Sequence, residues 1–110
     1  MSLYAEYIRE LSQGDVLETD KGFATYVFPD DTTCYIREIY VRPAFREQNA
    51  ASAMADLIVE KAKNRGCKTL LGSVTPSAKG STTSLRVLLA YGFSLLSSSN
   101  DYILFQKEIH

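Results

Sequence analysis

The sequence has no tryptophan, one histidine and two cysteines among its 110 residues. This is too few for a disulfide framework and for a structural zinc site, which takes about four cysteine or histidine ligands. Cys34 and Cys67 each lie in or beside an apolar segment, so we expect two buried free thiols. His110 stands alone at the end of the sequence, which argues against a catalytic or metal-binding role. We therefore expect no bound metal.

Excess charge and long hydrophobic runs are also lacking. The formal net charge is -1, so no overall charge attracts nucleic acid, and we expect no nucleic-acid partner. No apolar run approaches the roughly 18 residues of a membrane span. Charged residues are mixed through the apolar positions of Met1–Asp15, unlike a signal peptide. We expect a cytoplasmic protein with no membrane partner.

The composition that remains is that of a globular domain. Hydrophobic residues make up 45% of the chain and charged residues 23%. A chain of this length can bury one hydrophobic core. We therefore expect one domain that spans residues 1–110.

Hydrophobic periodicity predicts alternating helices and strands. Helices are expected over Ser2–Ser12, 50–65 and 84–91, the last with an N-cap among Ser81, Thr82 and Thr83. Strands are expected over 16–20, 23–28, 32–41, 67–76, 93–98 and 101–109. The first two strands form a hairpin, and Gly66 and Gly92 end the second and third helices.

The strand over 32–41 is mostly apolar on both faces. One face carries Cys34, Ile36, Glu38 and Tyr40, and the other carries Tyr35, Arg37, Ile39 and Val41. Strict alternation therefore predicts a strand that is covered on both sides. Strand 67–76 follows a helix, so we expect it to lie near strand 32–41 and parallel to it.

The junction after this strand is unusual in composition. A polar hexapeptide, Arg46–Ala51, leads directly into the helix that begins near residue 50. A helix N-terminus offers unpaired N–H groups and a positive partial charge, which suit an anion such as phosphate. Asn49, Ala50, Ala51 and Ser52 are small or tolerate left-handed φ, so a backbone there could approach the anion closely. The alternative is a polar helix start with alanines favoured for their helix propensity.

At these residues the chain resembles the GNAT superfamily of N-acetyltransferases. The signature of that family is a strand, a loop and a helix that carry Arg/Gln-x-x-Gly-x-Gly/Ala and cradle the pyrophosphate of acetyl-coenzyme A. Residues in the same order and spacing are Val41, Pro43, Arg46, Asn49 and Ala51. The segment "LLAYGF", which ends at Phe93, is similar to the second signature of the family.

The resemblance implies a fold and a co-substrate. The implied fold is α/β (α+β), with a mixed central sheet that is splayed between two parallel strands and flanked by helices. The implied co-substrate is acetyl-coenzyme A, with no metal. The residues implied to hold it are Tyr40, Val41, Arg46, Glu47, Gln48, Asn49, Ala50, Ala51 and Ser81.

The chain departs from the family pattern at two functional positions. Asn49 replaces the first glycine of the loop and adds a side chain where phosphate would lie. Leu88 stands where many members have a tyrosine that protonates the departing thiolate. Tyr91 lies three residues further along the helix and is our candidate for that acid. The alternative is that Tyr91 is a core residue.

Transfer of acetyl to an amine by direct attack on the thioester needs a base, because an alkyl ammonium has a pKa of about 10.4. Glu38 is our candidate, since an acidic residue near this position is frequent in the family. The alternative is that Glu38 forms an ion pair at a strand edge. The oxyanion would be held by a backbone N–H near Tyr40 or Val41. Tyr35, Tyr40 and Phe28 are either acceptor-pocket or core residues.

Two functions are thus in view. The first is acetyl-coenzyme A-dependent N-acetyltransfer to a small amine or a protein amine. The second is a non-catalytic module of the same fold that binds coenzyme A or a protein partner, because fold alone does not define function. The oligomeric state is not encoded in these patterns, and a homodimer is left open.

Overall fold

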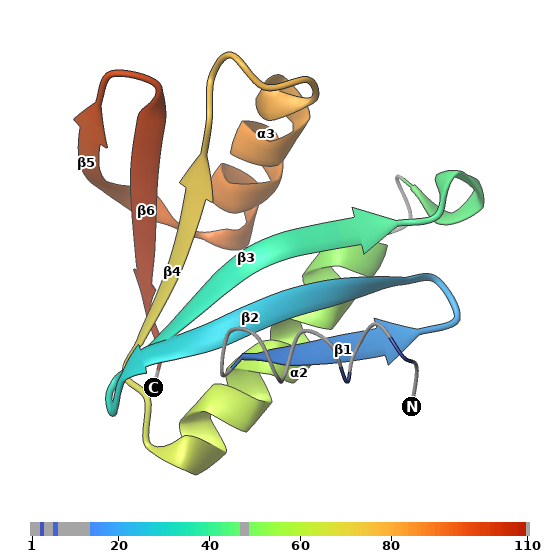
Figure 1. The fold of residues 1–110 in the computed structure, drawn as a ribbon, viewed down its shortest axis with the longest axis vertical. Helices are drawn as coiled ribbons and strands as arrows, with labels where there is room; N and C mark the ends of the chain where they lie inside the picture. The colour runs from blue at the N-terminus through green and yellow to red at the C-terminus, as the bar shows by residue number, and fades with distance from the viewer. Residues whose placement is uncertain (1–2, 4–5, 7–13, 47–48, 110) are drawn as a thin grey trace.

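The computed structural model describes residues 3, 6, 14–46 and 49–109. Within them it has a six-stranded sheet in the order β1-β2-β3-β4-β6-β5 (Figure 1). The strands are β1 (Asp15–Thr19), β2 (Gly22–Asp30), β3 (Thr33–Val41), β4 (Thr69–Val74), β5 (Ser94–Ser99) and β6 (Tyr102–Glu108). The other elements are α2 (Ala50–Arg65), α3 (Ser81–Tyr91) and a short 3-10 turn, η1 (Pro43–Phe45). The predicted order of elements from β1 onward and the α/β class are confirmed.

The parallel pair at the centre of the sheet is short. Thr33–Tyr35 of β3 pair with 69–71 of β4, and beyond these residues the two strands diverge (Figure 1). Every other neighbouring pair in this sheet is antiparallel. The splayed mixed sheet that the resemblance implied is therefore present.

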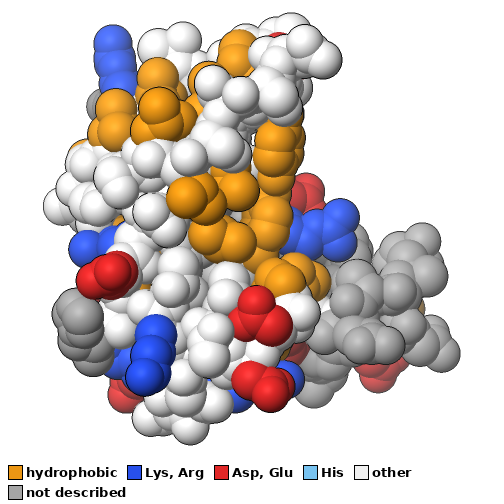
Figure 2. Space-filling model, turned by 90° about the vertical axis from the view of Figure 1, so that its left-hand side faces the viewer, with side chains coloured by type: hydrophobic (Ala, Val, Ile, Leu, Met, Phe, Trp, Pro, Cys, Tyr) orange, Lys and Arg blue, Asp and Glu red, His pale blue; other side chains and the backbone are white. Residues whose placement is uncertain are grey.

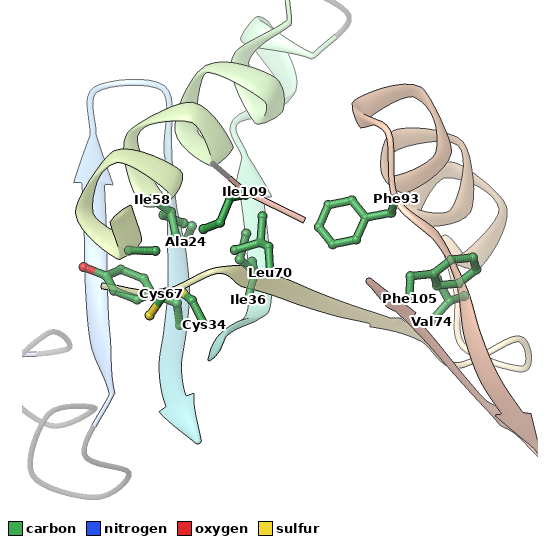
Figure 3. Close-up of a cluster of buried hydrophobic side chains, with 12 residues drawn as sticks. Ala24, Cys34, Ile36, Ile58, Cys67, Leu70, Val74, Phe93, Phe105 and Ile109 are labelled. Carbon is green, nitrogen blue, oxygen red and sulfur yellow. The ribbon is translucent and has the colours of Figure 1, made fainter. Parts of the chain in front are cut away.

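Both described helices pack on one face of the sheet. Ile58 of α2 is fully buried in the same hydrophobic cluster as Ala24 of β2 and Leu70 of β4 (Figure 3). Leu88 of α3 packs against the same cluster at Gly72 of β4. We call this side of the sheet the helix face and the other side the open face.

The two cysteines belong to this core. Cys34 is fully buried, Cys67 is 4% exposed, and both are free thiols (Figure 3). The prediction of two buried thiols is therefore confirmed. Cys34 of β3 pairs with Leu70 of β4, within the short region where these two strands are paired.

A β-bulge in β3 overturns the expected alternation of its side chains. Thr25 of β2 pairs with Glu38 of β3. The next residue of β2, Tyr26, pairs with Ile36, so Arg37 is the extra residue of the bulge. An extra residue reverses the face on which each following side chain lies.

The bulge brings Glu38 to a different face from the predicted one. Beyond it, Ile39 and Val41 share the helix face, because they pair with Ala24 and Gly22. Glu38 and Tyr40 join Tyr35 on the open face. Both are exposed, so the prediction that β3 is covered on both sides is wrong for its carboxyl half.

The helix boundaries agree with the sequence except at the start of α3. The second predicted helix ends as expected, with Gly66 at φ 96° donating its N–H to the last turn. The third begins at Ser81, before the predicted residue 84, and its N-cap is Gly80 at φ 84°, without a side-chain cap. Pro29 continues β2 instead of ending it. The helix predicted over Ser2–Ser12 lies outside the described residues, apart from Leu3 and Glu6.

One side of the molecule is rich in exposed apolar side chains. Figure 2 shows hydrophobic side chains gathered in its upper half and most charged side chains below them. Leu95 and Leu96 of β5 are 61% and 45% exposed, and Leu89 of α3 is 53% exposed. Among the described residues, no helix is long and apolar enough to cross a membrane.

Candidate active site

The amino end of α2 has the geometry expected of an anion site. Asn49, its N-cap, is left-handed at φ 60° and ψ 20°, and its side chain makes no capping hydrogen bond. The Asn49 carbonyl accepts the N–H of Ala53 at 3.0 Å, so the helix begins here. No acidic residue lies in the first turn. Among the described residues, no side-chain cap or first-turn carboxylate therefore offsets the positive partial charge of these N–H groups.

Arg46 is held between the end of β3 and the start of α2. Its Nε donates a hydrogen bond to the carbonyl of Val41 at 3.0 Å. Its guanidinium carbon lies 5.8 Å from the ring centroid of Tyr40, which itself stacks on Phe23 at 5.5 Å. The two terminal nitrogens of Arg46 make no hydrogen bond to any described residue. They are free to bind an anion beside the helix end.

The backbone of β3 turns hydrogen-bond donors toward the diverging β4. Arg42 donates its N–H to the carbonyl of Lys21 at 2.7 Å, on the β2 side. Successive residues of an antiparallel strand point their N–H groups to opposite edges. Val41 and Ile39 therefore direct theirs to the edge where β4 has moved away. Of the two predicted oxyanion donors, Val41 has this orientation and Tyr40 does not.

Glu38 lies on the open face of β3, near the point of divergence. Its side chain is exposed, and Oε1 accepts a hydrogen bond from Thr25 Oγ1 at 3.2 Å. Within the described part of the chain, no lysine or arginine forms an ion pair with it. A carboxylate in this setting is open to an incoming cation.

Tyr91 bridges the two helices. Its hydroxyl donates to Asp56 Oδ1 of α2 at 2.6 Å. Burial raises the pKa of Tyr91 well above its ordinary value, and the hydrogen bond to Asp56 and the charge of that carboxylate raise it further. The hydroxyl therefore stays protonated at neutral pH, and its proton points to Asp56.

Of the other residues singled out in the sequence, Leu88 and Ser81 are described by the structure, and two more are not. Leu88 packs against β4, where a Cβ on Gly72 would lie 2.9 Å from its Cδ2. Ser81 donates its hydroxyl to the carbonyl of Pro76 at 2.9 Å, within the loop before α3. Glu47 and Gln48 lie outside the described residues.

A group of hydroxyls on the open face was not predicted as a set. Tyr35 of β3 is hydrogen-bonded to Ser73 of β4 at 2.6 Å and to Tyr102 of β6 at 3.0 Å. The sequence pattern indicates only a pocket or core residue at Tyr35. Ser73 and Tyr102 are 38 and 67 positions from Tyr35 in the chain, so only the folded sheet brings the three residues together.

A cavity of about 590 Å³ lies at the other end of α2. Its lining residues are Lys63, Gly66, Cys67, Lys68, Thr69, Glu108 and Ile109. They surround the carboxyl end of α2 and the start of β4, whereas Asn49 and Arg46 lie at the amino end of α2. This cavity is therefore separate from the candidate active site.

Comparison with known proteins identifies the family. The sequence profile described as "Acetyltransferase (GNAT) family" matches residues 17–93, well over half of the chain. The chain belongs to the GNAT acetyltransferase family. No curated protein gives a significant match.

Solved structures confirm the fold. A GNAT-family protein from Desulfovibrio desulfuricans is similar with a TM-score of 0.79 and 18% identity, covering 96% of this chain and 78% of that one. A GNAT family acetyltransferase from Elizabethkingia anophelis, with acetyl-CoA bound, has a TM-score of 0.73 and 22% identity, covering 94% of this chain and 82% of that one. PaiA N-acetyltransferase from Thermoplasma acidophilum, in complex with coenzyme A, has a TM-score of 0.75 and 14% identity, covering 94% of this chain and 67% of that one. At these identities the likeness concerns the fold alone.

Proposed function

We propose that this protein is an N-acetyltransferase that moves the acetyl group of acetyl-coenzyme A to an amine. One observation carries the proposal: Arg46 is held at Val41, the last residue of β3, with its terminal nitrogens unbonded to any described residue, and it shortly precedes the amino end of α2, where Asn49 makes no side-chain cap. Membership of the family and the coenzyme bound in two of the similar structures support it. A cytoplasmic location remains a prediction.

The pyrophosphate is the part of the co-substrate that these residues fit. Phosphate oxygens would accept hydrogen bonds from the first-turn N–H groups of α2 and from Arg46. Ala50 and Ala51 place no long side chain there. Asn49 already has the left-handed backbone that glycine adopts most easily, so its replacement of glycine keeps the turn and adds only a side chain.

Acetyl transfer needs a neutral amine. We propose that Glu38 attracts the ammonium and accepts a proton from it, directly or through water. The nitrogen then attacks the thioester carbon, and the N–H of Val41 or Ile39 stabilises the resulting oxyanion. Collapse breaks the C–S bond and releases the thiolate, which takes up a proton, and the nitrogen loses its second proton to water to leave the neutral amide.

Tyr91 is the proposed source of that proton. A thiol has an ordinary pKa of about 8.5, so a thiolate leaves far more readily than an alkoxide. Donation from Tyr91 would aid the reaction without being essential to it. Because the Tyr91 hydroxyl donates to Asp56, it must break this hydrogen bond and rotate before it can donate its proton to the sulfur.

The second candidate is a non-catalytic module that binds coenzyme A or a protein partner. Leu88 at the usual acid position and the engaged hydroxyl of Tyr91 favour this alternative. The two candidates differ in turnover but share the coenzyme site. Release of free thiol from acetyl-coenzyme A in the presence of amines therefore separates them.

Glu38→Gln tests the proposed reaction. It should reduce kcat by about a hundredfold or more, because general-base catalysis contributes roughly that much. Coenzyme A affinity should stay unchanged, since Glu38 faces the acceptor. Glu60→Gln, at an exposed position of α2, is the matched control and should keep full activity. Equal loss of turnover and coenzyme affinity in Glu38→Gln would show a structural role instead.

A further inference from the structure

The hydroxyls of Tyr35, Ser73 and Tyr102, here called the hydroxyl cluster, come from three neighbouring strands, β3, β4 and β6. Tyr35 is central, with Ser73 Oγ at 2.6 Å and Tyr102 Oη at 3.0 Å from its own oxygen. Tyr102 is 42% exposed, so the cluster reaches solvent. A ligand on this face could touch it directly.

The hydroxyl cluster lies where the sheet splits. Tyr35 is the last residue of β3 that pairs with β4, and Ser73 is two residues beyond its partner, Leu71. Both side chains lie on the open face, as does Glu38 beyond the bulge. β3 and β4 diverge beyond this pairing (Figure 1), and Ser73 of the cluster lies on β4 while Glu38 lies on β3, one on each of the diverging strands.

The cluster has hydrogen-bonding capacity to spare. Three hydroxyls carry three protons, and the two bonds within the cluster use two of them. One O–H therefore remains to donate to a ligand. Burial raises the pKa of Tyr35, so its hydroxyl is neutral near pH 7. The nearby positive charge of Arg37 lowers the pKa of Tyr35, against the effect of burial. The same charge disfavours binding of a cation at the hydroxyl cluster.

We infer that the hydroxyl cluster and Glu38 are the two recognition points for the acceptor, which is an amine that also bears a hydrogen-bond-accepting oxygen. The inference rests on the proposed function, because it places the amine at Glu38. The ammonium meets the carboxylate of Glu38, and an amide or carboxylate oxygen of the same molecule accepts the spare O–H of the cluster. A diamine gains nothing there, since its second cation finds no negative charge and lies near Arg37.

Three series of acceptors with matched chain lengths test the inference: n-alkylamines, ω-amino amides and α,ω-diamines. At the best chain length, the amino amide should exceed the alkylamine in kcat/KM by about three- to tenfold, the worth of one hydrogen bond. The diamine should not exceed the alkylamine.

Variants assign that preference to the cluster. Each single deletion of a hydroxyl still leaves an O–H to donate, so the decisive variant removes all three, as Tyr35→Phe/Ser73→Ala/Tyr102→Phe. It should reduce the ratio of kcat/KM for the amino amide to that for the alkylamine toward unity. Tyr26→Phe is the matched control, because its hydroxyl bonds Asp15 on the helix face, and it should keep the preference.

The outcomes separate the two proposals. Turnover of alkylamines and amino amides at equal kcat/KM would overturn the inference and leave the proposed function intact. Persistence of the preference in the triple variant would overturn the inference in the same way. Absence of turnover with every amine, despite coenzyme A binding, would contradict the proposed function and the inference together.

Discussion

Gly22→Ala should disturb the end of β3 and, through it, the candidate active site. Gly22 pairs with Val41, and a Cβ at Gly22 would lie 1.9 Å from the carbonyl oxygen of Tyr40. Real Cβ atoms essentially never approach another atom within 3.0 Å, so the strands must separate by about 1.1 Å, the difference between 3.0 and 1.9 Å. The obstacle is backbone, so no side chain can rotate away.

The expected cost has two parts. Overpacking of a closely packed site typically costs about 1–3 kcal/mol, which urea denaturation would measure. The displaced carbonyl neighbours Val41, whose own carbonyl holds Arg46. A misplacement of this size can reduce turnover by about a hundredfold, so kcat/KM should fall more than stability alone explains.

Gly72→Ala is the matched control. There the new Cβ would meet Leu88 Cδ2 at 2.9 Å, and this is the end of a flexible side chain. It should cost less than Gly22→Ala and leave Arg46 in place. The reasoning is refuted if Gly22→Ala unfolds at the wild-type urea concentration with unchanged coenzyme affinity and turnover.

Three further outcomes are expected. Burial raises the pKa of Cys34 from 9.0 to about 12, so the folded chain keeps a proton that the unfolded chain loses. The free energy of unfolding should therefore fall as pH rises from 9.0 through about 12, and urea titrations of Cys34→Ala should show a smaller fall. Tyr91→Phe should lower kcat if Tyr91 is the acid, whereas unchanged kcat alongside lower stability would assign it to helix packing. Leu95→Lys, at a site 61% exposed on edge strand β5, should change the free energy of unfolding in urea by less than about 0.5 kcal/mol. A larger loss of stability would show that the Leu95 side chain packs within the fold.

Local patterns were sufficient to predict most elements. The helical spacing between Ala50 and Arg65, with Gly66 after it, depends only on neighbouring residues. The hairpin of β1 and β2 is likewise local, since five consecutive pairs join them across a short turn. Because such features depend on neighbouring residues, the sequence predicts their boundaries to within a few residues.

The face of Glu38 could not be predicted in the same way. Strict alternation placed it beside Cys34 and Ile36, but the bulge at Arg37 moved it to the open face. A bulge depends on how two strands pair, and the residues of β3 alone do not fix it. The exposure of Glu38 therefore became visible only in the folded sheet.

The candidate site was predicted in part for the same reason. Arg46 and the small residues at the start of α2 are contiguous, so their chemistry could be interpreted directly from the sequence. The bond between Tyr91 and Asp56 joins residues 35 positions apart, and it changes what the tyrosine hydroxyl can do. Long-range contacts of this kind also create the hydroxyl cluster.

The most direct test is whether coenzyme A stabilises the folded protein through the amino end of α2. At about a hundred times its dissociation constant it should add about 2.7 kcal/mol to the free energy of unfolding, seen as a thermal shift. Ala51→Asp should abolish the shift by placing a carboxylate where the pyrophosphate binds, yet remain folded, because a helix tolerates acid in its first turn. Asn49→Gly should keep or enlarge it. No shift in the wild type and none in Asn49→Gly would contradict the account.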